Sequence, residues 1–248
     1  DAFIVSTSAD SSIRFWDFAT GLPIMILESS YMKPSVAISG DNKYIVSGDT
    51  MGAVRMWDVC AEDKGVKIVH SEAVKGIAVS SDNKYIVSSS SDSTFHIWEL
   101  TTGRRIKKSS GLTDGSVRCL ALTDDSRYIV SGSEDNTVRI WELASGKEIK
   151  QIKGHDDAVT CVAITKDCKY IVSGSHDTTI RVWDFSTGEE FKKLTNHTGN
   201  VNCVSVTNDG NFIISGSEDS IIRIWKLATG EEMNSIHGHT KPVTCVAL

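Results

Sequence analysis

Short segments in which apolar and polar residues alternate follow one another along the whole chain, with turn residues between them. In one stretch, the runs AVTCVAI (158–164) and KYIVSGS (169–175) are joined by TKDC, and the runs TIRVWDF (179–185) and FKKLT (191–195) follow after further turn residues. Alternation with a period of two over four to eight residues is typical of half-buried strands. No segment sustains the spacing of three and four residues that an amphipathic helix requires. The pattern therefore predicts an all-β protein.

The tryptophans show that these strands belong to a repeat. They lie at intervals of 41, 41, 43, 42 and 42 residues, as Trp16, Trp57, Trp98, Trp141, Trp183 and Trp225. A serine precedes each tryptophan by ten residues, and an aspartate precedes five of them by six residues. The exception is the Trp57 repeat, which has Met51 in place of the aspartate. Four short strands in each period of about 42 residues predict stacked units that bury their apolar faces on one another.

In these features the chain resembles the WD40 repeat family. The resemblance rests on the period, on the Trp-Asp pairs at 16–17, 57–58 and 183–184, and on the Gly-His pairs at 154–155 and 238–239. It covers essentially the whole chain. It implies a β-propeller, in which each repeat forms one four-stranded blade and the blades surround a channel. We accordingly expect a single WD40 β-propeller domain over residues 1–248, with six four-stranded blades.

The resemblance also implies a hydrogen-bond network of His, Ser, Asp and Trp within each blade. Three complete sets match it, and in each of them the histidine precedes the aspartate by 22 residues. They are His70, Ser88, Asp92 and Trp98; His155, Ser173, Asp177 and Trp183; and His197, Ser215, Asp219 and Trp225. Ser, His and Asp also make up a catalytic triad. A catalytic site occurs once in a chain, however, whereas this set recurs, so we predict that the networks are structural.

Two blades depart from this pattern. The Trp141 blade has Thr113 where the histidine is expected. The Trp57 blade has Ser29 and Met51 in place of histidine and aspartate, and we expect it to be the least regular blade.

The two ends of the chain are predicted to complete one blade. GHTKPVTCVAL at the C-terminus aligns with GHDDAVTCVAI, which ends in a first strand, and AFIVSTS at the N-terminus aligns with the second strand KYIVSGS. We therefore expect residues 243–248 to pair with residues 2–8 and to close the ring. The network of this blade would consist of His239, Ser6, Asp10 and Trp16. The alternative is that the chain is part of a seven-bladed or larger propeller.

Composition narrows the classes of partner. The 248 residues carry a net charge of −6, with an isoelectric point near 5.6. A binder of nucleic acid or of anionic membranes usually presents a basic surface, so we expect neither as a direct partner. No apolar run approaches the length of a membrane span.

Cysteine and arginine both recur once per repeat. Cys119, Cys161, Cys203 and Cys245 occupy equivalent first-strand positions, where they could line a metal site or pack as small apolar residues. No CxxC or CxxH spacing supports a metal, so we predict packing, and neither a metal nor a cofactor is expected. The absence of a disulfide framework predicts an intracellular, cytoplasmic location, with a nuclear or cytoskeletal assembly as alternatives. We predict local salt bridges or stacking for the residues two positions before each tryptophan, which are Arg14, Arg55, His96, Arg139, Arg181 and Arg223.

The resemblance implies that partners bind on the face that carries two turns of each blade: the turn before the first strand and the turn between the second and third strands. Carried over by position, the candidate partner-binding residues are Tyr31, Met32, Asp114, Glu134, Asp156, His176, Asn200 and Glu218. This set contains no arginine, which argues against a reader of phosphorylated motifs. Its acidic residues suit a basic peptide, or they are solvated surface in an acidic protein.

No phosphate-binding loop, zinc-protease motif, nucleophile elbow or dinucleotide fingerprint is present. We therefore predict a protein that is not an enzyme: a scaffold for protein–protein interactions that works as part of a larger complex. A reader of Arg- or Lys-containing peptides through the acidic face is the first alternative. A propeller enzyme or sugar binder is the second, and it would need a polar cluster at the channel mouth, which the sequence does not reveal.

Overall fold

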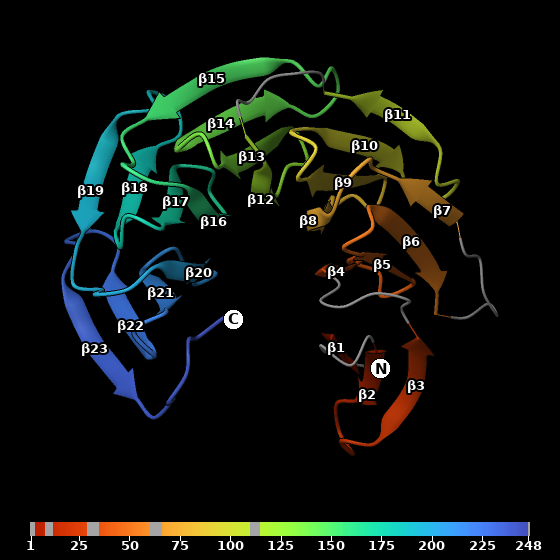
Figure 1. The fold of residues 1–248 in the computed structure, drawn as a ribbon, viewed down its shortest axis with the longest axis horizontal. Coiled ribbons are helices and arrows are strands. Elements are labelled where there is room, and N and C mark those ends of the chain that lie inside the picture. The colour runs from red at the N-terminus through yellow and green to blue at the C-terminus, as the bar shows by residue number, and fades with distance from the viewer. Residues whose placement is uncertain (1–2, 8–11, 29–34, 60–65, 110–114, 248) are drawn as a thin grey trace. The chain divides into compact units, whose positions relative to one another are not determined.

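The computed structural model describes residues 3–7, 12–28, 35–59, 66–109 and 115–247. These residues form 23 strands in six antiparallel sheets and contain no helix (Figure 1). The described segments contain no helix that is long and apolar enough to cross a membrane. The chain divides into two compact units, residues 1–108 and 109–248, and each is described by itself. We number the sheets 1 to 6 in chain order, one for each predicted blade.

The first unit contains sheets 1 to 3, and in each of them the strands neighbour one another in chain order. Sheet 1 consists of β1 (Phe3–Thr7), β2 (Ser12–Asp17) and β3 (Pro23–Glu28). Sheet 2 consists of β4 (Ser35–Ile38), β5 (Tyr44–Gly48), β6 (Ala53–Asp58) and β7 (Val66–Val69). Sheet 3 consists of β8 (Val74–Val79), β9 (Tyr85–Ser90), β10 (Phe95–Glu99) and β11 (Arg105–Lys108).

The second unit contains sheets 4 to 6, which are four-stranded and have the same order (Figure 1). Sheet 4 consists of β12 (Val117–Leu122), β13 (Tyr128–Ser133), β14 (Thr137–Glu142) and β15 (Glu148–Lys153). Sheet 5 consists of β16 (Val159–Ile164), β17 (Tyr170–Ser175), β18 (Ile180–Asp184) and β19 (Glu190–Leu194). Sheet 6 consists of β20 (Val201–Val206), β21 (Phe212–Ser217), β22 (Ile221–Lys226) and β23 (Glu232–His237).

Sheet 5 confirms the strands predicted from alternation to within a residue at each end. The turn before β19 contains Gly188 with φ +78°, a left-handed conformation that glycine adopts without strain. This explains the recurring Thr-Gly turn between the third and fourth strands. The all-β architecture predicted from the pattern is thus present, with the four strands per repeat that the WD40 resemblance implies in each of sheets 2 to 6.

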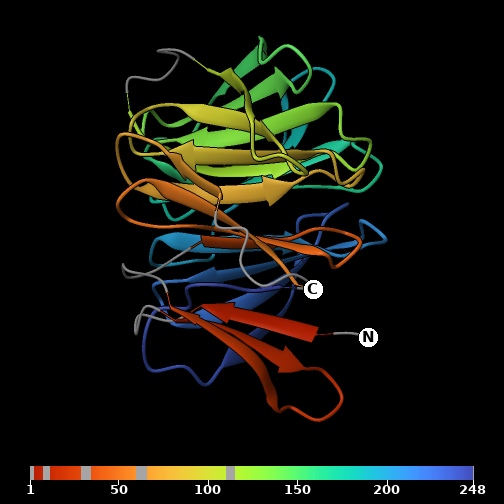
Figure 2. The same cartoon turned by 90° about the vertical axis from the view of Figure 1, so that its right-hand side faces the viewer.

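The sheets of each unit stack through one recurring contact (Figure 2). In the second unit, Trp183 of sheet 5 packs against Val138, Ile140 and Ile152 of sheet 4, and all four side chains are buried. Trp225 of sheet 6 occupies the equivalent place on sheet 5. In the first unit, Trp98 packs in the same cluster as Val54 and Met56 of sheet 2. Each such tryptophan therefore joins its own sheet to the one before it, and large-to-small changes of this kind cost about 3–5 kcal/mol.

The first-strand cysteines pack against a glycine on the neighbouring strand. Cys161 pairs with Gly174, and a Cβ added to this glycine would lie 2.6 Å from the Cys161 sulfur. The same pairing joins Cys119 to Gly132 and Cys203 to Gly216. In sheet 3 the glycine lies on the first strand instead, where Gly76 pairs with the larger Ser89 of the second strand. One small residue and one larger residue at this pair keep the packing volume nearly constant.

Sheet 1 has three strands among the described residues, and its first strand, β1, pairs there with β2. Residues 238–247 form no strand, so the predicted pairing of residues 243–248 with residues 2–8 is not among the strand pairs of the described chain. Ala2 and Leu248 lie outside the described residues. This pairing would join the first unit to the second, and it stays a prediction.

The expectation that sheet 2 is the least regular sheet stays a prediction, because β4 and β7 adjoin residues outside the described ones. In sheets 3 to 6, the ladder between the third and fourth strands shifts register beside the tryptophan. The described β6–β7 ladder ends at the pair of Met56 and Val66, so it does not reach Trp57.

Candidate functional site

Three sheets contain a histidine held between a serine and an aspartate. In sheet 5, His155 Nε2 lies 2.7 Å from Ser173 Oγ, and His155 Nδ1 lies 2.8 Å from Asp177 Oδ2. The Trp183 indole donates a hydrogen bond of 2.8 Å to the same serine oxygen. The histidine comes from the turn before the first strand, the serine from the second strand and the tryptophan from the third strand. The network therefore ties together all but the last strand of its sheet.

Sheets 6 and 3 repeat this geometry. His197 lies 2.8 Å from both Ser215 and Asp219, and Trp225 donates to Ser215 at 2.9 Å. In sheet 3 the distances from His70 are 2.7 Å to Ser88 and 3.2 Å to Asp92, and that from Trp98 to Ser88 is 2.9 Å.

Burial and hydrogen bonding favour the neutral form of the network histidines and the ionised form of their aspartates. Burial lowers the pKa of His70 and His197, although Asp92 and Asp219 partly offset this effect. Burial alone would raise the pKa of Asp92, but hydrogen bonds from Thr94 and the nearby His70 bring it down to about 2. Neutral imidazoles and ionised carboxylates are therefore the stable states near pH 7.

The His, Ser and Asp of each network are the residue types of a catalytic triad, but they are not placed to act as one. Ser88, Ser173 and Ser215 are fully buried. Each serine oxygen accepts a hydrogen bond from the indole N–H. We therefore assign the serine O–H as the donor to Nε2 of the histidine, which leaves the histidine proton on Nδ1, facing the aspartate. A nucleophile must reach its substrate, and these hydroxyls do not reach the surface. The geometry suits a network that stiffens the sheet.

The remaining sheets keep only part of the network. In sheet 1, Trp16 donates to Ser6 at 2.8 Å, whereas His239 is exposed and Asp10 lies outside the described residues. In sheet 4, Trp141 donates to Ser131 at 2.8 Å, and Arg139 binds Asp135 at 2.7 Å. Thr113 lies outside the described residues.

Sheet 2 replaces the missing aspartate from a neighbouring position. Trp57 donates to Ser47 at 3.2 Å. Where other sheets use an aspartate six residues before the tryptophan, sheet 2 uses Asp49, which accepts the backbone N–H groups of Met51 and Ala53 at 2.9 Å. Sequence reasoning missed Asp49 because it lies two residues before the expected position. Ser29 lies outside the described residues.

The predicted partner-binding residues lie on a repeated backbone frame. In four sheets, the backbone N–H of a residue between the second and third strands donates to a carbonyl in the turn before the first strand. The donor and acceptor pairs are Ser91 and Ala73, Glu134 and Ser116, His176 and Ala158, and Glu218 and Asn200. Tyr31, Met32 and Asp114 lie outside the described residues. The frame is constant, while the side chain that it presents is serine in sheet 3, histidine in sheet 5 and glutamate in sheets 4 and 6.

Arg118 changes the charge of this face in the second unit. Its guanidinium lies 2.9 Å from the carboxylate of Glu134 and 3.4 Å from Nε2 of His176, so it brings two predicted residues together. Asp156 is exposed and lies 3.6 Å from Arg181. Glu218 has no ion pair among the described residues. Sequence reasoning missed Arg118 because it belongs to the first strand rather than to a turn, although it directly precedes the repeated Cys119.

The arginines two positions before tryptophan form ion pairs in the second unit. Arg139 and Arg181 bind Asp135 and Glu190 at 2.7 and 2.6 Å. Arg223 lies 2.8 Å from Asp219. Their burial explains why each needs a carboxylate partner.

The described cysteines are free thiols. Burial raises the pKa of Cys161 to about 12 and that of Cys203 to about 11, which makes them unreactive packing residues. Cys245 departs from the prediction, because it is exposed in a segment that forms no strand. No group of three or more metal-ligating side chains occurs in the part of the chain that the structure describes.

A family model described as WD domain, G-beta repeat matches four segments, residues 61–99, 104–142, 146–184 and 188–226, which together make up more than half of the chain. The match at 146–184 begins with β15 of sheet 4 and continues through β16, β17 and β18 of sheet 5. One sequence repeat thus spans two sheets. A search of curated proteins finds no match.

Proposed function

Because this chain belongs to the WD40 repeat family, whose repeats generally mediate protein–protein interactions, we propose that it is a non-catalytic scaffold within a multiprotein assembly. The observation that carries this proposal is the constant backbone frame of the second unit, which presents Glu134, His176 and Glu218. A rigid frame lowers the entropic cost of binding, and varied side chains supply specificity. The buried network serines support a role without catalysis.

Affinity capture with mass spectrometry tests this proposal. The wild-type chain and a Glu134→Ala/His176→Ala/Glu218→Ala variant serve as parallel baits. Partners that the wild type retains and the variant loses would support the scaffold and its face. An Asp124→Ala/Asp167→Ala variant, with changes in turns between first and second strands, serves as the control that should retain the partners. Failure of the wild type to capture any protein would contradict the proposal.

A narrower function for the same face is the recognition of basic peptides. The exposed carboxylate of Glu218, which no described cation neutralises, favours it together with the exposed Asp156. Arg118 works against it by neutralising Glu134. A Glu134→Lys/Asp156→Lys/Glu218→Lys variant should abolish the binding of an Arg-rich peptide in fluorescence anisotropy, and unchanged affinity would contradict this alternative. Arg118→Ala should strengthen the binding.

We also propose that residues 1–248 form one domain and that the protein is intracellular. In support of a single domain, one family match, at residues 104–142, crosses the boundary between the two compact units at residue 108, so one repeat contains residues of both units. In support of an intracellular location, the buried free thiols of Cys161 and Cys203 suit a reducing compartment such as the cytoplasm. Other proteins, rather than nucleic acids or membranes, are the partners that we propose.

A further inference from the structure

The last strand of sheet 3 lacks a glutamate that the following three sheets share. In sheets 4 to 6, the residue paired with the tryptophan on the fourth strand is Glu148, Glu190 or Glu232. Each glutamate faces the arginine of the third strand, at 3.8, 2.6 and 3.3 Å. In sheet 3 the same two positions hold Arg105 and His96. The carboxylate has been replaced by a cation and the arginine by an imidazole.

Sheet 3 thus keeps a cation over its tryptophan, but it lacks the glutamate that pairs with the cation in sheets 4 to 6. The Arg105 guanidinium lies 5.9 Å from the centre of the Trp98 indole, and in sheet 5 Arg181 occupies the same place over Trp183 at 6.0 Å. The His96 side chain is 1% exposed, and its Nδ1 has no hydrogen-bond partner among the described residues. Sheet 3 therefore lacks the anion around which this part of sheets 4 to 6 is built.

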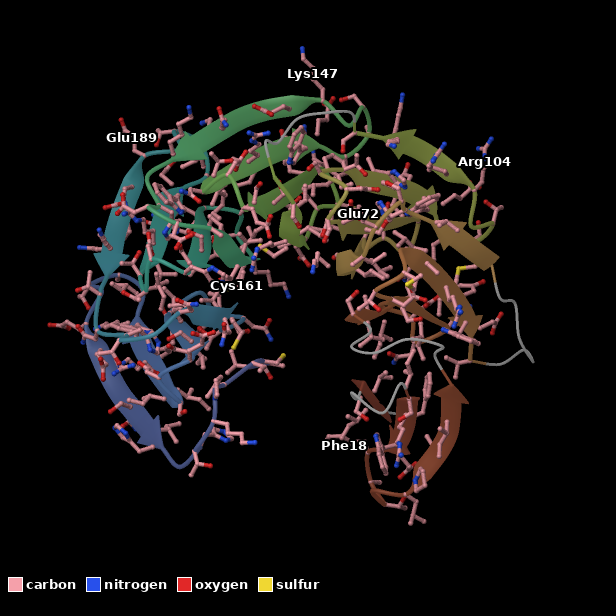
Figure 3. The ribbon with its side chains drawn as sticks, viewed as in Figure 1. Phe18, Glu72, Arg104, Lys147, Cys161 and Glu189 are labelled. Carbon is pink, nitrogen blue, oxygen red and sulfur yellow. The ribbon has the colours of Figure 1, made fainter. Side chains whose placement is uncertain are left out.

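Positive charge continues along the whole of β11. Arg104, Arg105, Lys107 and Lys108 fall within five positions, and all four are exposed. Arg104 lies 4.0 Å from Glu99, but Arg105, Lys107 and Lys108 have no ion pair in the described residues. Figure 3 shows Arg104 at the start of this strand, pointing away from the sheet. Clustered cations of this kind repel one another unless a counter-charge is supplied.

The register places this charge on both faces of the strand. Arg105 lies opposite Trp98 and Lys108 lies opposite His96, so these two share the face of the buried imidazole. Lys107 lies opposite Ile97, on the other face. β11 is also an edge strand, because sheet 3 has the order β11-β10-β9-β8. No described strand pairs with its outer backbone N–H and C=O groups, and an added strand would pair with them.

We propose that β11 is a docking edge for an acidic, extended segment of a partner protein. The segment adds as a further strand, and its carboxylates lie against Arg105 and Lys108, supplying the anion that Glu148, Glu190 and Glu232 supply in the other sheets. A peptide strand fits better than a nucleic acid, because the edge offers backbone hydrogen bonds and the chain as a whole carries a charge of −6.

Protection of an edge strand is the simpler explanation for charges on β11. Lysine on an exposed edge discourages aggregation. The outer strands β15 and β19 have lysines too, but each also keeps a glutamate that pairs with an arginine of its sheet. Protection alone does not explain why β11 has lost that glutamate. The proposal goes beyond the scaffold role and does not depend on the face that contains Glu134 and Glu218.

Fluorescence anisotropy with the full 248-residue chain tests the proposal. The probe is a labelled alternating Glu-Thr peptide of about eight residues, with the matching Gln-Thr peptide as the neutral control. Arg105→Glu/Lys108→Glu restores the glutamate of the other sheets, and Arg105→Gln/Lys108→Gln removes only the charge. The matched control is Lys147→Glu/Lys193→Glu, two exposed lysines of the second unit. Thermal unfolding checks that all variants fold.

Wild type should bind the Glu-Thr peptide, and both Arg105/Lys108 variants should weaken this binding at least about tenfold. The control variant should change it less than about twofold, and backbone N-methylation of the peptide at alternate residues should abolish it. The proposal is overturned if the Gln-Thr peptide binds equally well, if the control variant has the same effect, or if N-methylation has none. A single-stranded oligonucleotide that binds β11 more tightly than the peptide would also overturn it. Failure here, with partners still captured through the other face, leaves the scaffold function standing.

Discussion

Sheets 3 and 5 contain the same His–Ser–Asp–Trp network, but different charges surround it. In sheet 5, Arg181 lies near both Asp177 and Glu190, at 3.9 and 2.6 Å. In sheet 3, His96 stacks on His70 with ring centres 3.9 Å apart, and Arg105 replaces the glutamate. The same network is therefore present in two different electrostatic surroundings, one with an arginine–glutamate pair beside it and one with a buried histidine and an exposed arginine.

The tryptophan of each of the two sheets is buried in an apolar cluster that it shares with the preceding sheet. Trp98 and Trp183 are each 2% exposed and pack on the sheet before them. Replacing either with alanine should lower the free energy of unfolding by about 3–5 kcal/mol, from lost burial and the remaining cavity. Guanidinium unfolding followed by circular dichroism measures the effect. Trp57→Ala is the control, and it should cost less because this side chain is only half-buried. A cost below about 1 kcal/mol for Trp98→Ala would show that sheet 3 is packed differently.

Exchanging the charged pair tests whether the two positions act together. Arg181→His leaves Glu190 and Asp177 without their cation and should destabilise the protein by about 2–3 kcal/mol. Arg181→His/Glu190→Arg rebuilds the arrangement of sheet 3 and should recover about half of this loss. A double-mutant cycle in urea gives the coupling energy. Strictly additive effects would mean that His96 and Arg105 of sheet 3 are independent.

The stacked histidines make sheet 3 sensitive to acid. Burial, then the neighbouring His70 and Arg105, lower the pKa of His96 to about 3, while Asp92 acts in the opposite direction and Lys108 adds to the lowering. An unfolded histidine, with a pKa near 6.5, binds a proton more readily, so stability is present above this value and declines as the pH falls toward 3. We expect a loss of about 2 kcal/mol between pH 7 and 4.5, a range in which Asp92 is still ionised.

Urea unfolding at a series of pH values measures this loss. His96→Phe, which keeps a ring beside His70 and removes the ionisable group, should reduce the loss by at least half. Lys193→Gln, an exposed change in the second unit, is the control and should leave the pH dependence unaltered. An identical pH profile for wild type and His96→Phe would assign the acid sensitivity to another group.

The smallest effect is expected at the surface pair of Arg118 and Glu134. Their side chains are 33% and 40% exposed, so solvent screens the attraction. Arg118→Ala should change the free energy of unfolding by less than about 1 kcal/mol, and added salt should reduce the difference further. Thermal unfolding at low and high salt measures it. A larger, salt-independent cost would show that Arg118 supports the frame of the turns rather than only the charge of the face.

Prediction from sequence succeeded where one geometry recurs. The resemblance to the WD40 family implied networks at His70, His155 and His197, and in each case the structure places the histidine against an aspartate and a serine. It failed where a residue outside the pattern takes over. Asp49 replaces the carboxylate absent at Met51, and Arg118 neutralises Glu134 from a different strand. A single sequence shows that an expected residue is missing, but not which neighbour replaces it.

The alternation of apolar and polar residues and the even spacing of the tryptophans were enough to establish the strands, their order within each sheet and the repeat. These are local properties, because side chains alternate along a strand and each hairpin joins consecutive segments. The pairing of Arg118 with Glu134 and the burial of His96, whose Nδ1 no described residue binds, depended on the tertiary structure. Contacts between segments distant in sequence follow from packing, and packing depends on the whole chain at once.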